Sequence, residues 1–143
     1  FIKKIKALDL LVKLDTNGSH PELLEEILNE KIVDYVAMDI KAPLEQYGEY
    51  APNIDIEKIR KSIEIVKKFP DYEFRTTISK NLSYEDLESI VKKIKPKKYF
   101  IQQMKFVKTL DESFKPSVYS EKELNEICEK LKKHVAICRV RNL

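Results

Sequence analysis

The apolar positions of this chain follow two alternating spacings. Short runs in which every residue or every second residue is apolar predict strands, and longer stretches with apolar residues three and four apart predict helices. The predicted strands are 10–14, 33–40, 72–78, 98–104 and 135–140. Strands that alternate with helices are typical of a parallel sheet. We therefore expect an α/β protein with about four βα units and one further strand.

Helix-start signals separate the predicted strands. Pro21 suits the first turn of a helix that follows the turn Asn17-Gly18. Asp55 is a candidate cap for the next helix, and Ser83 and Ser120 each begin a capping-box pattern with an acidic residue three positions later. The first eight residues already have helical spacing. These signals place one helix between each pair of strands and a short helix before the first.

Two longer connections interrupt this pattern. They cover residues 42–53, after the second strand, and residues 105–119, after the fourth strand. Loops of this length in compact domains are commonly functional. Tyr47 and Tyr50 in the first loop suit either packing of the loop or contact with a partner.

Composition narrows the classes of function. A chain of 143 residues with 43% apolar residues fits one domain, residues 1–143. Its two glycines are too few for a glycine-rich phosphate loop, and 27 basic against 24 acidic residues leave a net charge of only +3, which argues against a nucleic-acid partner. No apolar run approaches the roughly 20 residues that span a bilayer. We expect a cytoplasmic protein with no membrane partner.

The two cysteines match no metal-binding pattern. Cys128 and Cys138 lie ten residues apart, which is neither a C-x-x-C motif nor a zinc-ligand spacing. Cys128 shares a helical face with Leu124, Ile127 and Leu131. We expect both cysteines to be buried packing residues that are not reactive.

Polar residues gather at the ends of the predicted strands. Because the carboxyl ends of parallel strands meet at one rim, these side chains should lie together. In chain order they are Asp15, Thr16, Asp39, Lys41, Arg75, Thr77, Gln102 and Gln103. Two facing carboxylates would need Lys41, Arg75 or a metal ion between them. The mixture suits a zwitterionic ligand, and it suits a structural network of ion pairs equally well.

Two of these strand ends carry motifs that resemble a known family. Leu14-Asp15-Thr16-Asn17-Gly18 is followed by Ala37-Met38-Asp39-Ile40-Lys41. In order and spacing, the pair resembles the radical S-adenosylmethionine (SAM) activases of glycyl-radical enzymes, such as the activators of pyruvate formate-lyase and of anaerobic ribonucleoside-triphosphate reductase. Arg75-Thr76-Thr77 and Ile101-Gln102-Gln103 fall where that family has further barrel strands, so the resemblance covers nearly the whole chain.

The resemblance implies a fold, a chemistry and a partner. The fold is a partial (β/α) barrel of the radical SAM type, in which a [4Fe–4S] cluster reduces SAM to a 5′-deoxyadenosyl radical. That radical abstracts a hydrogen atom from a glycine of the partner, a glycyl-radical enzyme of the formate-lyase or anaerobic ribonucleotide reductase type. The resemblance also implies that Asp15, Thr16 and Asp39 hold a monovalent cation beside the carboxylate of SAM.

Further cofactor-binding positions follow from the same resemblance. It places Lys41, Arg75 and Thr77 around the sulfonium, ribose and adenine of SAM, and it includes Asn17 in the cofactor site. The family's histidine beyond the last barrel strand has no counterpart in Met104-Lys105-Phe106-Val107.

Two family motifs are absent from these 143 residues. They are C-x-x-x-C-x-x-C, which holds the cluster, and G-G-E, which binds the amino group of SAM; both come earlier in the family order. We therefore expect the C-terminal part of a partial barrel that lacks its N-terminal units. In isolation it should bind no cluster, be inactive, and self-associate through the uncovered sheet edge.

An alternative is a stand-alone, non-catalytic βα module of flavodoxin-like topology that acts in protein–protein interaction through residues 42–53. Strand order separates the two hypotheses. Strands that follow one another in sequence order fit the partial barrel, whereas a doubly wound order with helices on both faces fits the module.

Overall fold

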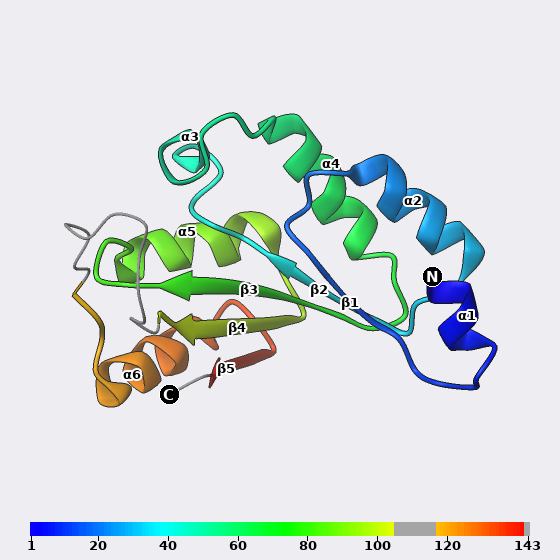
Figure 1. Ribbon diagram of the computed structural model, residues 1–143. Helices are drawn as coiled ribbons and strands as arrows, with labels where there is room; N and C mark the ends of the chain where they lie inside the picture. The colour runs from blue at the N-terminus through cyan, green and yellow to red at the C-terminus, as the bar shows by residue number, and fades with distance from the viewer. Residues whose placement is uncertain (105–116, 142–143) are drawn as a thin grey trace.

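The computed structural model of the protein describes residues 1–104 and 117–141 (Figure 1). Within these residues, the strands form one parallel sheet in the order β1-β2-β3-β4-β5. They are β1 (Lys13–Thr16), β2 (Tyr35–Asp39), β3 (Tyr72–Ile78), β4 (Lys98–Gln103) and β5 (Ile137–Arg141). Strands in sequence order match the partial barrel and differ from the doubly wound order of the alternative hypothesis.

The helices precede or connect these strands. They are α1 (Ile2–Lys6), α2 (Pro21–Glu30), α3 (Tyr47–Tyr50), α4 (Ile56–Val66), α5 (Tyr84–Ile94) and α6 (Glu121–Leu131). The buried apolar faces of α2, α4, α5 and α6 pack with the sheet in one hydrophobic cluster, against which Ile2 and Ile5 of α1 are only partly buried. No helix in the described part of the chain has the length and apolar character needed to cross a membrane.

The two faces of the sheet differ in character. One face supplies buried side chains to the hydrophobic cluster: Val36, Met38, Phe74, Ile78, Tyr99 and Ile101. Side chains alternate across a strand, so the intervening positions lie on the other face. Those positions include Asp15, Asp39, Glu73, Arg75 and Arg141. An apolar face covered by helices and a polar second face confirm the α/β class, and they place the charged residues opposite the main core.

Several predicted helix starts are confirmed. The Asp55 side chain accepts a hydrogen bond from Glu57 N at the start of α4. Ser83 and Ser120 both form capping boxes, with Asp86 and Glu123 as their respective partners. A capping side chain satisfies backbone N–H groups that have no partner within the helix. The sequence therefore determines where these helices begin by local chemistry.

Two local predictions need correction. The first strand begins at Lys13 rather than at residue 10, and Leu10 and Leu11 are exposed. The loop 42–53 contains the short helix α3, in which Tyr47 is buried. Most of the irregular stretch predicted at 105–119 lies outside the described residues.

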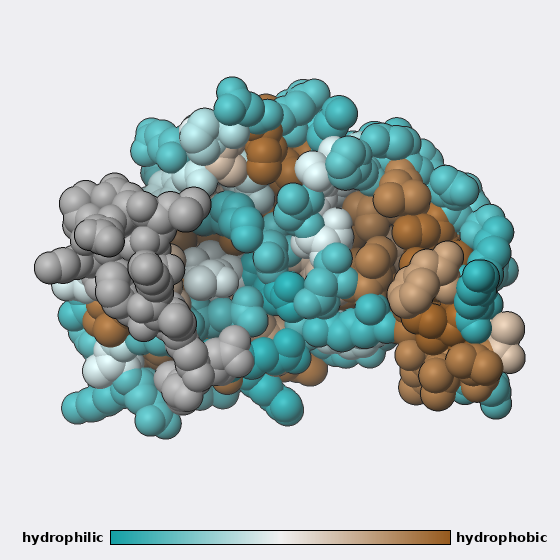
Figure 2. Space-filling model, in the orientation of Figure 1, coloured by the Kyte–Doolittle hydropathy of each residue, from teal (hydrophilic) through white to brown (hydrophobic). Residues whose placement is uncertain are grey.

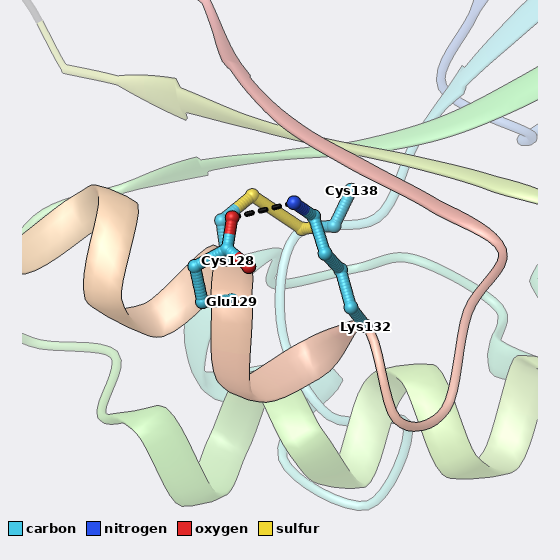
Figure 3. Close-up of a disulfide and its surroundings, with 4 residues drawn as sticks. All are labelled: Cys128, Glu129, Lys132 and Cys138. Carbon is cyan, nitrogen blue, oxygen red and sulfur yellow. Dashed lines mark hydrogen bonds and ion pairs between the residues drawn. A yellow bond between two sulfur atoms is a disulfide. The ribbon is translucent and has the colours of Figure 1, made fainter.

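The cysteines are buried as expected, but they are also joined to each other. Cys128 of α6 and Cys138 of β5 form a disulfide, with their Cα atoms 5.5 Å apart (Figure 3). The interpretation as simple packing residues was therefore incomplete. A spacing of ten residues does not indicate the pairing, because the contact arises only when α6 packs against β5.

Candidate functional site

Three charged residues meet at the carboxyl end of the sheet. The strand register places Asp39 of β2 beside Arg75 of β3, and it places Asp15 of β1 beside Ala37 of β2. Nη2 of Arg75 lies 3.0 Å from Oδ2 of Asp15, and Nε of Arg75 contacts Oδ1 of Asp39. One guanidinium therefore bridges both carboxylates. Of the three counter-ions expected between them, it is Arg75 that contacts both.

Two lysines complete the cluster. Nζ of Lys13 lies 3.2 Å from Oδ1 of Asp15, and Nζ of Lys41 lies 3.2 Å from Oδ2 of Asp39. Every oxygen of the two carboxylates thus has a cationic partner. Asp15 and Asp39 supply two negative charges, and Lys13, Lys41 and Arg75 supply three positive charges. One positive charge remains in excess, which favours an anionic group on a ligand.

The pKa shifts follow from these contacts. Partial burial raises the pKa of Asp15, but hydrogen bonds from Arg75 and Lys13 outweigh it and leave the pKa below its ordinary value. Burial likewise works against the charged form of Arg75, and the bonds to Asp39 and Asp15 outweigh it, so its pKa is raised. The guanidinium and the Asp15 carboxylate are therefore both charged at neutral pH.

The turn after β1 forms one wall of the site. Thr16 Oγ1 accepts a hydrogen bond from Gly18 N at 3.0 Å, and Asn17 Oδ1 accepts one from Ser19 N at 3.0 Å. Gly18 has a φ of +77°, a conformation that glycine adopts without the steric cost of a side chain. The sequence Thr-Asn-Gly thus builds a compact turn from its own side chains.

Together these residues line a surface pocket of about 370 Å³. The pocket is lined by Asp15, Thr16, Asn17, Asp39 and Arg75; we call it the rim pocket. Its volume lies within the range of small-molecule sites, about 300–1,000 Å³. Hydrophilic side chains occupy much of the middle of the molecular surface in Figure 2.

The remaining predicted site residues lie beside this pocket. Lys41 reaches it through Asp39, and its backbone N–H donates to the Tyr47 hydroxyl at 3.2 Å. Thr77 is two residues beyond Arg75 in β3, where its hydroxyl donates to Gln102 Oε1 at 3.4 Å. The pocket lining does not include Thr77.

Other contributors do not follow from the strand-end pattern. Lys13 lies at the start of β1, and the only signal for it is that strand alternation places it on the same side as Asp15. Ser62 of α4 donates a hydrogen bond to the Gly18 carbonyl at 2.7 Å. No local motif indicates that contact, because the two residues are 44 positions apart.

The donor set can be compared with the groups that the family resemblance implies. Asp15, Thr16 and Asp39 offer carboxylate and hydroxyl oxygens, which suit a hard cation. A metal ion would have to share or take carboxylate oxygens that now contact Arg75 and the lysines. Among residues 1–104 and 117–141, no group of three or more His, Cys, Asp or Glu residues is placed to hold a metal. The chain's two cysteines are joined to each other, so they do not fit a [4Fe–4S] cluster.

A second charged cluster lies on the same face of the sheet, nearer the start of β3. The Glu73 side chain is fully buried; Arg141 of β5 donates to it through Nη1 at 2.6 Å and Nη2 at 2.9 Å. The Tyr35 hydroxyl donates to Glu73 Oε2 at 2.6 Å. Burial, together with the bond to Glu73, raises the pKa of Tyr35 well above its ordinary range. We call this set the buried cluster.

The architecture and the position of the rim pocket define a class. A parallel sheet in sequence order, with its charged residues at the carboxyl ends of the strands, is the arrangement that β/α-barrel enzymes use for their active sites. The sheet order supports this class, and the charged rim lies at the end where such barrels bind ligands.

The comparisons with known proteins specify the class further. No protein-family model matches the chain. Over 133 residues it is 39% identical to a protein of Methanocaldococcus jannaschii that is named as a glycyl-radical enzyme activating enzyme. The match covers 87% of this chain and 55% of the relative, so the chain spans about half the length of the curated relative it matches.

A solved structure supports the fold. It is a domain of the pyruvate-formate lyase-activating enzyme from Bacteroides vulgatus, with a TM-score of 0.68 and 13% sequence identity. The match covers 99% of this chain and 87% of the solved chain. The predicted resemblance to the C-terminal portion of a glycyl-radical-enzyme activase is therefore confirmed: the sequence comparison supports the family resemblance, and the structural one supports the α/β fold.

Proposed function

We propose that this chain is part of a radical SAM enzyme that activates a glycyl-radical enzyme, and that it supplies part of the SAM site. The observation that carries the proposal is the convergence of Asp15 and Asp39, from the two family-like motifs, on Arg75 at the rim pocket. The relative's name supports the reaction class. In this proposal the isolated chain is inactive, because the cluster-binding and G-G-E motifs are not among its residues.

The charges of the rim pocket suit a zwitterionic ligand. SAM carries a carboxylate, an ammonium group and a sulfonium, and it supplies the radical chemistry when it is bound in the complete protein. The excess positive charge of the pocket attracts the carboxylate, with Arg75 and Lys41 as the available hydrogen-bond donors. Asn17 and Thr77 have polar groups that can bind the ribose or adenine. The role of this chain is thus to bind and orient SAM.

In the same proposal, Asp15, Thr16 and Asp39 hold a monovalent cation beside the ligand. Their oxygen atoms are suitable ligands, and the two carboxylates already lie close enough for one guanidinium to contact both. A cation at this place would share these oxygens with Arg75, Lys13 and Lys41.

The proposed partner is a glycyl-radical enzyme of the formate-lyase or anaerobic ribonucleotide reductase type, and the proposed location is the cytoplasm. The isolated chain is proposed to self-associate. Figure 2 shows an apolar area near α1, and the exposed large apolar side chains include Phe1, Leu8, Leu10 and Leu11. Contiguous exposed apolar surface favours association.

A SAM titration of the complete protein, with its cluster reconstituted under anaerobic conditions, tests the site. Asp39→Asn should weaken SAM binding on the order of tenfold, because Arg75 and Lys41 lose the ion pairs that hold them in position for the ligand. Asp71→Asn is the matched control: Asp71 also forms an ion pair, with Lys98, but it lies just before β3 at the opposite end of the strand. Unchanged affinity in Asp39→Asn, or equal loss in both variants, refutes the site.

A further inference from the structure

A buried hydroxyl on α4 reaches the turn that forms one wall of the rim pocket. Ser62 is fully buried, and its Oγ donates to the carbonyl oxygen of Gly18 at 2.7 Å. Gly18 follows Thr16 and Asn17, both of which line the pocket. The bond therefore connects the interior of the protein to the pocket wall through one peptide group.

A serine is unfavourable at position 62 of α4 unless its hydroxyl forms a hydrogen bond, here to the Gly18 carbonyl. Its helix buries Ile59, Ile63, Ile65 and Val66, and a small apolar residue such as alanine would favour the helix more. Burying a hydroxyl without a partner also costs free energy. Departures from local preference of this kind are expected where a site needs them.

The turn is held from a second side by β2. A Cβ atom on Gly18 would lie 2.2 Å from Met38 Cε and 3.3 Å from Ser62 Cβ. The turn thus packs directly between these two neighbours. Met38 immediately precedes Asp39 in β2. The turn therefore packs against the strand that carries the Asp39 carboxylate on the other side of the pocket.

We propose that Ser62 is a positioning residue for the rim pocket: through the Gly18 carbonyl it holds the turn in the place where Thr16 and Asn17 can meet a ligand. This inference rests on the proposed function, because the ligand is taken to be SAM. Without the hydroxyl, a buried carbonyl loses its partner, and the turn moves to find another. Ser62 itself touches no ligand.

The test compares Ser62→Ala with two controls in the complete, cluster-reconstituted protein. Ile65→Val removes one buried methyl group from the same helix and lowers stability without removing a hydrogen bond. Ser89→Ala makes the same chemical change in the middle of α5. Two quantities are measured well below the unfolding temperature: the dissociation constant of SAM, and the hydrogen-exchange rates of the Gly18 and Ser19 amides.

Ser62→Ala should weaken SAM binding roughly threefold to tenfold, the effect of losing one hydrogen bond. The Gly18 and Ser19 amides should also exchange faster, because they donate to Thr16 and Asn17 within the turn. Both controls should leave the affinity and these exchange rates unchanged.

The other outcomes separate this inference from the proposed function. Faster exchange with unchanged SAM affinity, or equal loss of affinity in Ile65→Val, overturns the positioning role and leaves the SAM site standing. Unchanged exchange in Ser62→Ala also overturns it. If the unaltered complete protein binds no SAM, the proposed function fails and the inference falls with it.

Discussion

The rim pocket and the buried cluster both depend on β3, two residues apart, yet they differ in how their charges are satisfied. Glu73 is fully buried, and its two oxygens take two bonds from Arg141 and one from Tyr35. The guanidinium of Arg141 also lies over the Phe100 ring, 3.6 Å from its centre. Both carboxylate oxygens of Glu73 therefore already accept hydrogen bonds from within the protein.

The rim is looser and more exposed. Asp15 and Asp39 keep 52% and 26% of their side-chain surface, and their shared partner Arg75 keeps 13%. The three cations around these two carboxylates leave a positive excess, and solvent reaches the groups from the pocket. A ligand can exchange partners here at little cost, whereas at Glu73 it would have to expose a buried charge. Similar residue types thus support a structural role in one place and binding in the other.

The largest expected effect is on stability in the buried cluster. Glu73→Ala leaves the Arg141 guanidinium and the Tyr35 hydroxyl without their partner, and we expect a loss of about 3 kcal/mol in the free energy of unfolding. Asp15→Ala at the rim should cost less than about 1 kcal/mol, because exposed ion pairs contribute little. Urea denaturation of both variants measures the difference. Equal losses would contradict the division between a structural and a binding cluster.

The next effect concerns the disulfide that joins α6 to β5, the strand that carries Arg141. The bond spans ten residues of sequence, and closing a loop of that size stabilises a protein by about 2–3 kcal/mol. Reduction should lower the free energy of unfolding by that amount, measured by urea denaturation. The double variant Cys128→Ser/Cys138→Ser should show no response to reductant. Alkylation without reductant should leave the mass of the unfolded protein unchanged; addition of two alkyl groups would show that the thiols are free.

Reduction also separates the two clusters. Since β5 supplies Arg141 but no residue of the rim pocket, the reduced protein should lose stability without losing its charged rim. SAM affinity of the complete protein, measured below the unfolding midpoint, should be the same before and after reduction of this bond. The double serine variant allows that comparison without exposing the iron–sulfur cluster to thiol reagents.

Local sequence signals predict part of the fold well. The strand predicted at 72–78 is β3, where Tyr72, Phe74 and Ile78 alternate with polar residues along the strand. The capping boxes at Ser83 and Ser120 determine their helix starts by contacts within four residues. The first strand is displaced because Leu10 and Leu11 are apolar but exposed. Hydrophobicity indicates burial only where a neighbouring element covers the residue.

The site follows the same division. Asp15, Asp39 and Arg75 are predictable because the ends of parallel strands converge. The bond from Ser62 to Gly18 and the disulfide depend on how a helix packs against elements distant in sequence, and no spacing rule contains that information. Glu73 presents a related problem: alternation places it on the face of Arg75, but only the register of β5 supplies Arg141 as its partner.

The smallest expected effect is the pH dependence of the rim. The pKa of Asp15 is lower in the folded protein than its ordinary value of 3.8, so its ion pairs contribute stability above about pH 4. That contribution disappears as the pH falls below 3.8 and through the folded-state pKa. Near neutral pH, the free energy of unfolding of the unaltered protein should therefore exceed that of Asp15→Asn by less than about 1 kcal/mol. The two free energies should converge in acid. Urea unfolding at a series of pH values measures the gap; a gap that widens as the pH falls would show that Asp15 is not held ionised by Arg75 and Lys13.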